Sequence, residues 1–157
     1  MFYLSSKFPR KKIIAIEPFK NGVANIAHHC LENKIKNIFI FPFVFQKFLK
    51  KYKNFSFEQC YIFFPDPWPK KRHHKRRLVN YATLLELIKR CNKKGEIYFG
   101  SDNEHYFENV YDYAKDLKKI MDIKLKKAKK TPTTHTKYHR RAQKLKNNIN
   151  FLKIAKS

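Results

Sequence analysis

Residues 63–77, with the sequence FFPDPWPKKRHHKRR, combine a single carboxylate with a dense run of basic residues. Asp66 stands between two prolines and is followed by Trp68, and six of the eight positions from 70 to 77 are Lys or Arg. Because the prolines fix φ on both sides of Asp66 and disfavour a helix, the carboxylate should be held on a stiff, extended turn. The adjoining basic run indicates an anionic polymer as the partner.

The residues before this turn predict a buried strand. Residues 60–64, CYIFF, form a short apolar and aromatic run, so Asp66 should emerge where the strand ends. In open α/β sheets, ligands bind at the carboxyl ends of the strands. The sequence therefore predicts that Asp66 lies in a ligand site beside a basic surface.

The 63–77 segment closely resembles the signature of the tRNA (guanine-N7-)-methyltransferase family, enzymes that use S-adenosylmethionine and have a Rossmann-like methyltransferase fold. Four further segments match this family in order and cover nearly the whole chain: IAIE at 14–17, NGVA at 21–24, GSDNE at 100–104 and TKYH at 136–139. The resemblance implies methyl transfer from S-adenosylmethionine to N7 of a variable-loop guanine in tRNA.

The resemblance also implies roles for individual residues. Asp66 would be the catalytic carboxylate and would lie against the cofactor, and Glu17 would accept hydrogen bonds from the cofactor ribose. The residues expected to bind the substrate are Lys70, Asp102, Thr136, Lys137, Tyr138 and His139. Those expected to contact tRNA phosphates are Lys71, Arg72, Lys75, Arg76 and Arg77. No metal is expected.

The chemistry itself asks little of the protein. Guanine N7 has an available lone pair and no proton, so its methylation needs positioning and no general base. Positive charge develops on the purine as the methyl group arrives, and a carboxylate such as Asp66 would stabilise it. The same carboxylate could accept hydrogen bonds from the N1–H and the exocyclic amine of guanine.

Each of these residues has a simpler structural alternative. Glu17 could merely end a strand, and Asp66 could hydrogen-bond its own backbone in the turn. Asp102 could be an acid favoured by a helix dipole. His73 and His74 invite a metal site, but no Cys, Asp or Glu lies near them in the sequence.

Tyr138 could stack on a base or simply anchor its loop to the core. Thr136 and Lys137 could belong to an ordinary polar loop.

The charge of the chain agrees with a nucleic-acid partner. The 157 residues include 36 Lys plus Arg against 12 Asp plus Glu, giving a net charge of +24 and a pI of about 10.1. An AT-rich coding sequence could produce part of this excess of Lys. The distribution is more informative, because no acid occurs between Asp66 and Glu86 and none from 123 to 157.

The remaining composition favours a soluble intracellular protein without a metal centre. The three cysteines, Cys30, Cys60 and Cys91, have no paired spacing that would indicate zinc or a disulfide framework. No apolar run approaches the length of a membrane helix, and no signal peptide is recognisable. We expect a cytoplasmic protein, with a monomer favoured.

The pattern of the chain alternates strands and helices. Strands are expected at 12–17, 37–41, 60–64, 95–99 and 148–154, and helices at 22–33, 45–51, 78–92 and from a Ser101/Glu104 capping box to about 121. This order predicts one α/β domain over 1–157 with a mostly parallel sheet and helices on both faces. The polar, Lys/Thr-rich stretch 124–141 is predicted to be a basic substrate loop.

The glycine-rich turn that a nucleotide-type cofactor needs is missing from this sequence, whose first glycine is Gly22. The resemblance places the first strand and its glycine loop upstream of Met1. We therefore expect an N-terminally truncated Rossmann-like fold, with two apolar strand edges left unpaired in the middle of the sheet.

Two alternatives remain open at this stage. The chain could be a degenerate, non-catalytic member of the family or a gene fragment that retains only tRNA binding, because the glycine loop is absent, Phe43 and Val44 stand where the family carries an acid, and His139 replaces a glutamate. It could also be an unrelated basic nucleic-acid-binding module, which would lack an ordered Asp66 turn.

Overall fold

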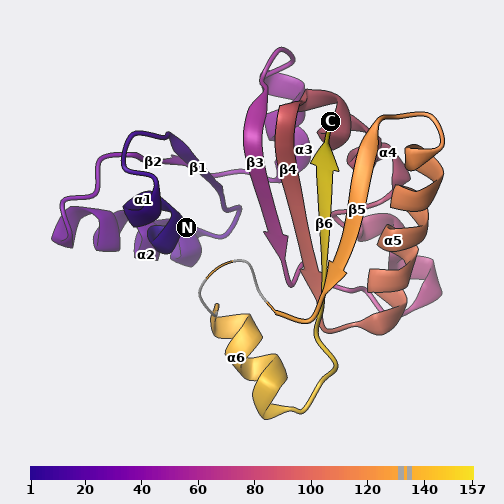
Figure 1. The fold of residues 1–157 in the computed structure, drawn as a ribbon. Coiled ribbons are helices and arrows are strands. Elements are labelled where there is room, and N and C mark those ends of the chain that lie inside the picture. Colours follow the sequence, from indigo (N-terminus) through magenta and orange to yellow (C-terminus); the bar gives the residue numbers. More distant parts are fainter. Residues whose placement is uncertain (131–132, 134–135) are drawn as a thin grey trace. The chain divides into compact units, whose positions relative to one another are not determined.

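The protein is described by a computed structural model that covers residues 1–130, 133 and 136–157 (Figure 1). It divides into two compact units, Met1–Phe55 and Ser56–Ser157, which are considered separately below. The first unit contains α1 (Phe2–Lys7), β1 (Ile13–Ile16), α2 (Lys20–Glu32), β2 (Ile38–Phe41) and α3 (Phe45–Lys51). The second contains β3 (Phe57–Phe63), the 3₁₀ helix η1 (Lys71–Arg76), α4 (Tyr81–Arg90), β4 (Cys91–Ser101), α5 (Glu104–Lys118), β5 (Ile123–Ala128), α6 (Lys137–Lys144) and β6 (Asn150–Lys156).

The first unit is a βαβ arrangement, as the alternating pattern predicted. Strands β1 and β2 pair in parallel, with Ile13 opposite Ile38 and Ile16 opposite Phe41, and α2 connects them. Phe48 of α3 is only 3% exposed and packs edge-on against Phe41, with ring centroids 5.3 Å apart. This small aromatic core holds the two strands and thereby places the residues that follow β1.

The second unit is a four-stranded sheet in the order β3-β4-β6-β5. Strands β3 and β4 are parallel, whereas β6 runs antiparallel to both β4 and β5. Helices α4 and α5 contact each other and pack on β4 (Figure 1). The core between them consists of side chains that are at most 1% exposed: Leu84, Leu87, Ile88, Ile97, Phe99, Tyr106, Phe107, Val110, Ala114, Leu117, Leu152 and Ile154.

The α/β class is confirmed. Among the described residues, β1 pairs only with β2, and β3 pairs only with β4.

Two local predictions were wrong. Helix α5 does not begin with a Ser101 capping box: Ser101 is the last, buried residue of β4, and the cap is Asn103, whose side chain accepts from Tyr106 N at 2.8 Å. The stretch 124–141 is not a single loop, because it contains most of β5 and the start of α6. The lysines of β5 obscured its alternation, since only Ile123 is buried and Leu125 half-buried there.

Candidate active site

The Asp66 turn follows β3 directly and has an unusual backbone. Phe64 has φ 53° and donates its N–H to the Gly100 carbonyl at 2.8 Å, and Trp68 has φ 44°. Bulky side chains rarely adopt positive φ, and such strained residues persist where the surrounding structure over-determines them. The turn that contains Asp66 is thus bounded by two aromatic residues in rare conformations.

The Asp66 carboxylate is exposed and makes no hydrogen bond or ion pair with the described residues. The simpler alternative, a turn residue bonded to its own backbone, is therefore not seen. The carboxylate lies close enough to the buried Tyr106 to influence its ionisation: burial is the main cause that raises the pKa of Tyr106 to about 12, and the charge of Asp66 acts in the same direction. Asp66 is thus available to a ligand.

The basic run forms the short helix η1 next to the turn. Five of its cationic residues are exposed: Lys70, Lys71, Arg72, Lys75 and Arg76. Two of the neighbouring side chains hold Trp68, because the Arg76 guanidinium lies 5.1 Å from the Trp68 ring and the His73 ring meets it edge-on at 5.8 Å. These exposed cations begin four residues after Asp66 and could bind the phosphates of a ligand next to the turn.

Arg77 differs from these neighbours and corrects the expectation that it contacts phosphate. Its side chain is buried, at 5% exposure, and its Nε donates to the Pro67 carbonyl at 2.8 Å. The sequence did not reveal this role, because Arg77 stands in a uniform run of bases and nothing in its spacing marks it as buried.

The end of β4 brings Asp102 to the same edge of the sheet as the Asp66 turn, since β3 and β4 are parallel and Phe63 pairs with Gly100. The Asp102 Oδ2 accepts a hydrogen bond from the Asn147 side chain at 2.9 Å, beyond the end of α6. Asp102 is half-buried and tied to this segment, and it lies at the same edge of the sheet as the Asp66 turn.

Helix α6 carries the remaining expected substrate residues. Thr136 caps the helix, because its Oγ1 accepts from His139 N at 3.1 Å. Lys137 and Tyr138 are exposed, with 60% of Tyr138 accessible. Lys137 and Tyr138 are thus free to meet a ligand, whereas the Thr136 hydroxyl already serves the helix. Residues 131–132 and 134–135, within the predicted substrate loop, lie outside the described part of the chain.

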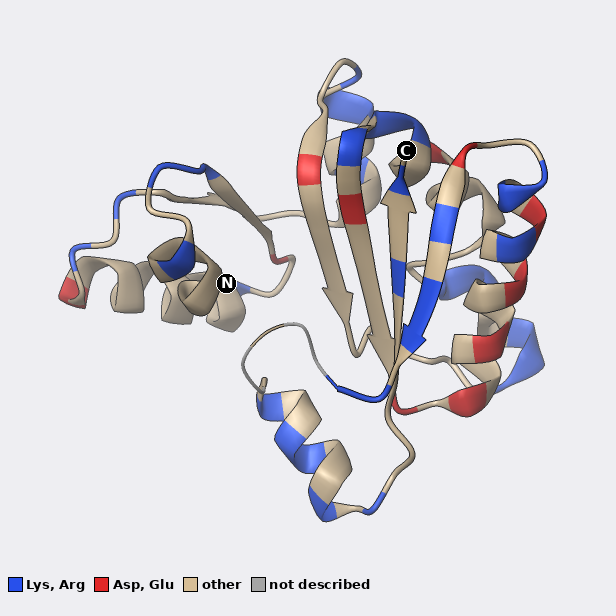
Figure 2. Ribbon diagram, viewed as in Figure 1, with Lys and Arg blue, Asp and Glu red and all other residues tan. Residues whose placement is uncertain are grey.

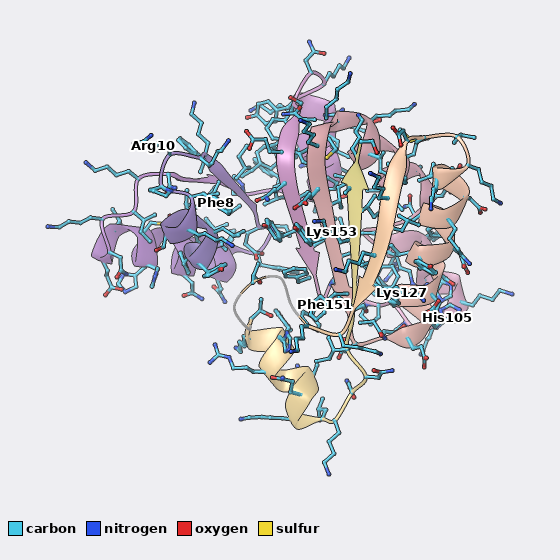
Figure 3. All side chains as sticks on the ribbon, in the orientation of Figure 1. Phe8, Arg10, His105, Lys127, Phe151 and Lys153 are labelled. Atoms are coloured by element: carbon cyan, nitrogen blue, oxygen red, sulfur yellow. The ribbon has the colours of Figure 1, made fainter. Side chains whose placement is uncertain are left out.

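His139 does not lie on the surface of α6. It is 5% exposed, and its ring centroid lies 5.7 Å from those of both Phe64 and Phe151, the latter marked in Figure 3. Gly100 makes room for this cluster, because a Cβ there would lie 2.6 Å from the Phe151 ring. His139 therefore anchors α6 to the residue that opens the Asp66 turn, and its burial does not fit the expected direct contact with substrate.

In the first unit, Glu17 follows β1. Its Oε1 accepts from Phe19 N at 2.9 Å, whereas its second carboxylate oxygen has no hydrogen-bond partner among the described residues. The side chain lies against Gly22, where a Cβ would come within 2.6 Å of the Glu17 Cδ. This glycine leaves room for an oriented carboxylate with one free oxygen, which fits a hydroxyl group of a ribose.

The segment after β2 offers no carboxylate. Phe43 and Val44 are 48% and 44% exposed, and Phe43 packs against Phe41 and beneath the Lys47 ammonium. An adenine in this region would meet an aromatic surface.

The described residues contain no group of three or more His, Cys, Asp or Glu side chains placed to hold a metal ion. Within the same part of the chain, no helix has the length and apolar character needed to cross a membrane.

Comparison with known proteins identifies the family of this chain. Residues 1–152 match a family described as "Putative methyltransferase". A tRNA (guanine-N(7)-)-methyltransferase of Wolbachia pipientis is 33% identical over 155 residues, which cover 99% of this chain and 69% of that protein. A protein of the same name from Buchnera aphidicola is 32% identical over 117 residues, covering 74% of this chain and 49% of its own.

Among solved structures, a precorrin-6y C5,15-methyltransferase from Geobacter metallireducens has a TM-score of 0.65 at 11% identity and covers 98% of this chain and 71% of its own. This likeness shows the methyltransferase fold. The sequence matches go further, and by them the chain belongs to the tRNA (guanine-N(7)-)-methyltransferase family.

Proposed function

We propose that this protein transfers a methyl group from S-adenosylmethionine to N7 of a guanine in tRNA, and that the guanine lies in the variable loop. The observation that most supports this proposal is the exposed Asp66 carboxylate, which has no hydrogen-bond or ion-pair partner among the described residues. It lies on a strained turn at the end of β3, shortly before a run of exposed cations. The relatives named above are tRNA (guanine-N(7)-)-methyltransferases. The chain spans about half the length of the Buchnera protein and about two thirds of the Wolbachia one.

The bound cofactor supplies a methyl group attached to a sulfonium centre. Glu17 would hold its ribose through the free carboxylate oxygen, and Asp66 would face the reacting purine. Since N7 carries no proton, no side chain has to act as a base. Asp66 stabilises the positive charge that develops on the guanine ring and orients the ring by accepting from its N1–H and exocyclic amine.

The substrate is held by the surroundings of the turn. Lys70 and the exposed cations of η1 bind tRNA phosphates, as do the Lys and Arg side chains of α6. Tyr138, exposed on α6, provides a ring on which a base can stack. Asp102 orients this region through Asn147. A tRNA substrate is consistent with a cytoplasmic location.

We also infer that the two compact units belong to one methyltransferase-like domain. The matching family segment runs across both of them, from residue 1 to 152.

Incubation with methyl-labelled S-adenosylmethionine and unmodified tRNA tests the proposal. The labelled nucleoside, isolated after nuclease digestion, should be 7-methylguanosine, and cleavage at the modified base should map it to the variable loop. A label on another atom or another RNA class would contradict the proposal. Tight tRNA binding without any cofactor binding or methyl transfer would favour the non-catalytic alternative.

A further inference from the structure

The buried Arg77 guanidinium connects the Asp66 turn to helix α5. Its Nε donates to the Pro67 carbonyl at 2.8 Å, and its Nη2 lies 3.2 Å from Nδ1 of His105, which Figure 3 marks at the start of α5. The third nitrogen, Nη1, lies 2.9 Å from the side-chain oxygen of Asn109 in the amide orientation that also lets Asn109 donate to the His105 carbonyl. Each guanidinium nitrogen therefore has a partner.

The α5 side of this connection is rigid. Between His105 and Asn109, Tyr106 is fully buried, and the Arg77 guanidinium lies 4.7 Å from the centre of its ring. The Tyr106 hydroxyl accepts from Val79 N at 2.8 Å, which fixes the chain two residues after Arg77. A cation stacked on a buried ring in a desolvated place is held firmly.

The turn side of the connection is strained. The Pro67 carbonyl belongs to the peptide group that leads into Trp68, whose φ of 44° is rare for an aromatic residue. A hydrogen bond to this carbonyl fixes the plane of that peptide and so opposes relaxation of Trp68. Because Asp66 immediately precedes Pro67, relaxation of the turn would also move the Asp66 carboxylate.

We propose that Arg77 is a positioning residue for methyl transfer: it holds the Pro67 carbonyl from α5 and thereby keeps Asp66 in its reactive place. This inference rests on the proposed function for its catalytic consequence, and on the geometry of the turn alone for its structural one. A lysine could not replace Arg77, because an ammonium is a point charge and cannot present the planar fork that reaches three separate acceptors.

The chain contains its own reporter of this turn, since Trp68 is its single tryptophan. We would compare the wild type with R77K and R77M by acrylamide quenching of tryptophan fluorescence, with far-UV circular dichroism to verify the fold. The matched control is R90M in α4, which removes another largely buried arginine, one that is paired with Glu86 at 2.6 Å and lies outside the turn.

The expected result is stronger quenching and a red-shifted emission of Trp68 in both Arg77 variants, with neither change in R90M. In methyl-transfer assays, R77K should lower kcat about 100-fold, the size of loss that a displacement of roughly 1 Å can cause, while the Kd values for S-adenosylmethionine and tRNA stay within about twofold.

Unchanged Trp68 fluorescence in folded R77K and R77M would overturn the proposal, as would an equal change in R90M. If R77M does not fold, R77K decides, because it retains the positive charge. The fluorescence measurement does not need methyl transfer. If the wild type shows no methyl transfer but the Arg77 variants shift the Trp68 fluorescence, the structural role of Arg77 is supported and the proposed function is contradicted. If the wild type is active but the Arg77 variants leave the Trp68 fluorescence unchanged, the proposed function is supported and the role of Arg77 is contradicted.

Discussion

Asp66 is positioned before any ligand arrives. The aromatic residues Phe64 and Trp68 at the two ends of its turn have positive φ, and each is held from outside: Phe64 by the Gly100 carbonyl and Trp68 by the Arg76 guanidinium over its ring. Strain of this kind, of order 1–3 kcal/mol per residue, is typical of functional sites. The held turn supports the proposal that the Asp66 carboxylate is pre-organised to stabilise charge.

A prediction at the scale of single residues concerns Glu17. E17A should weaken binding of S-adenosylmethionine by about tenfold to 100-fold, because a hydrogen bond to a charged group contributes roughly 1.5–3 kcal/mol. Isothermal titration calorimetry measures this Kd directly. E32Q, an exposed acid paired with His28 in the same unit, is the matched control and should bind as the wild type does. Equal affinities for E17A and wild type would remove Glu17 from the cofactor site.

Some strands and helices could be predicted from the sequence and others could not. A strand was predicted at 60–64, because a short apolar and aromatic run is typical of a buried strand, and β3 indeed covers Phe57–Phe63. Helix α3 lies at 45–51, where a helix was expected. Strand β5 was missed, since its lysines point to solvent at the edge of a sheet and leave only Ile123 and Leu125 to signal burial. Tertiary packing, and not local pattern, makes it a strand.

The candidate site shows the same division. The Asp66 turn was predicted from its own prolines and the preceding strand. The burial of Arg77 and His139 could not be predicted. Their partners Tyr106 and Phe151 are distant from them in the sequence, and only the fold brings them together.

At the scale of strands, the Glu96 carboxylate of β4 predicts how stability depends on pH. Partial burial opposes its ionisation, but the hydrogen bonds from Lys153 and Tyr98 outweigh this, so the pKa of Glu96 is lowered from its ordinary value. A lowered folded-state pKa adds stability that is fully present above the ordinary value and is lost as the pH falls through the lowered one.

E96Q should therefore lower the free energy of unfolding by at most about 1 kcal/mol near neutral pH, since the pair with Lys153 is partly exposed. Its urea midpoint should also fall less than that of the wild type between about pH 5 and about pH 3. Circular dichroism during urea titration measures both. A parallel pH dependence in the two proteins would show that the Glu96 pair adds nothing.

Across the second unit, charged side chains are unevenly distributed. Helix α5 carries a stripe of acids at helical spacing, whereas Lys and Arg gather on α6 and β5 (Figure 2). The four acids of this stripe are Glu104, Glu108, Asp112 and Asp116. Three of these acids pair with lysines: Glu108 with Lys127, Asp112 with Lys115 and Asp116 with Lys119. Because the outer face of α5 therefore has no excess of positive charge, tRNA should bind through η1 and α6 and leave this face free.

Reversing charge on α6 tests this footprint. The R140E/R141E double variant changes two exposed residues and should weaken tRNA binding. It should also reduce the slope of log K against log salt concentration by about 1–2, because each lost phosphate contact removes a little under one released counterion. K118E on α5 changes an exposed lysine outside the footprint and should leave both affinity and slope unchanged. Equal losses in the two proteins would indicate general charge attraction.

The most direct test of the account is methyl transfer by D66N, because this change keeps the size and shape of the side chain and removes only its charge. We predict that kcat for 7-methylguanosine formation falls about 100-fold or more, the loss typical of removing a group that stabilises transition-state charge. The Kd values for tRNA and S-adenosylmethionine should change little, and Trp68 fluorescence should remain that of the wild type. A wild-type kcat in D66N would contradict the central claim that the charge of the Asp66 carboxylate stabilises the transition state.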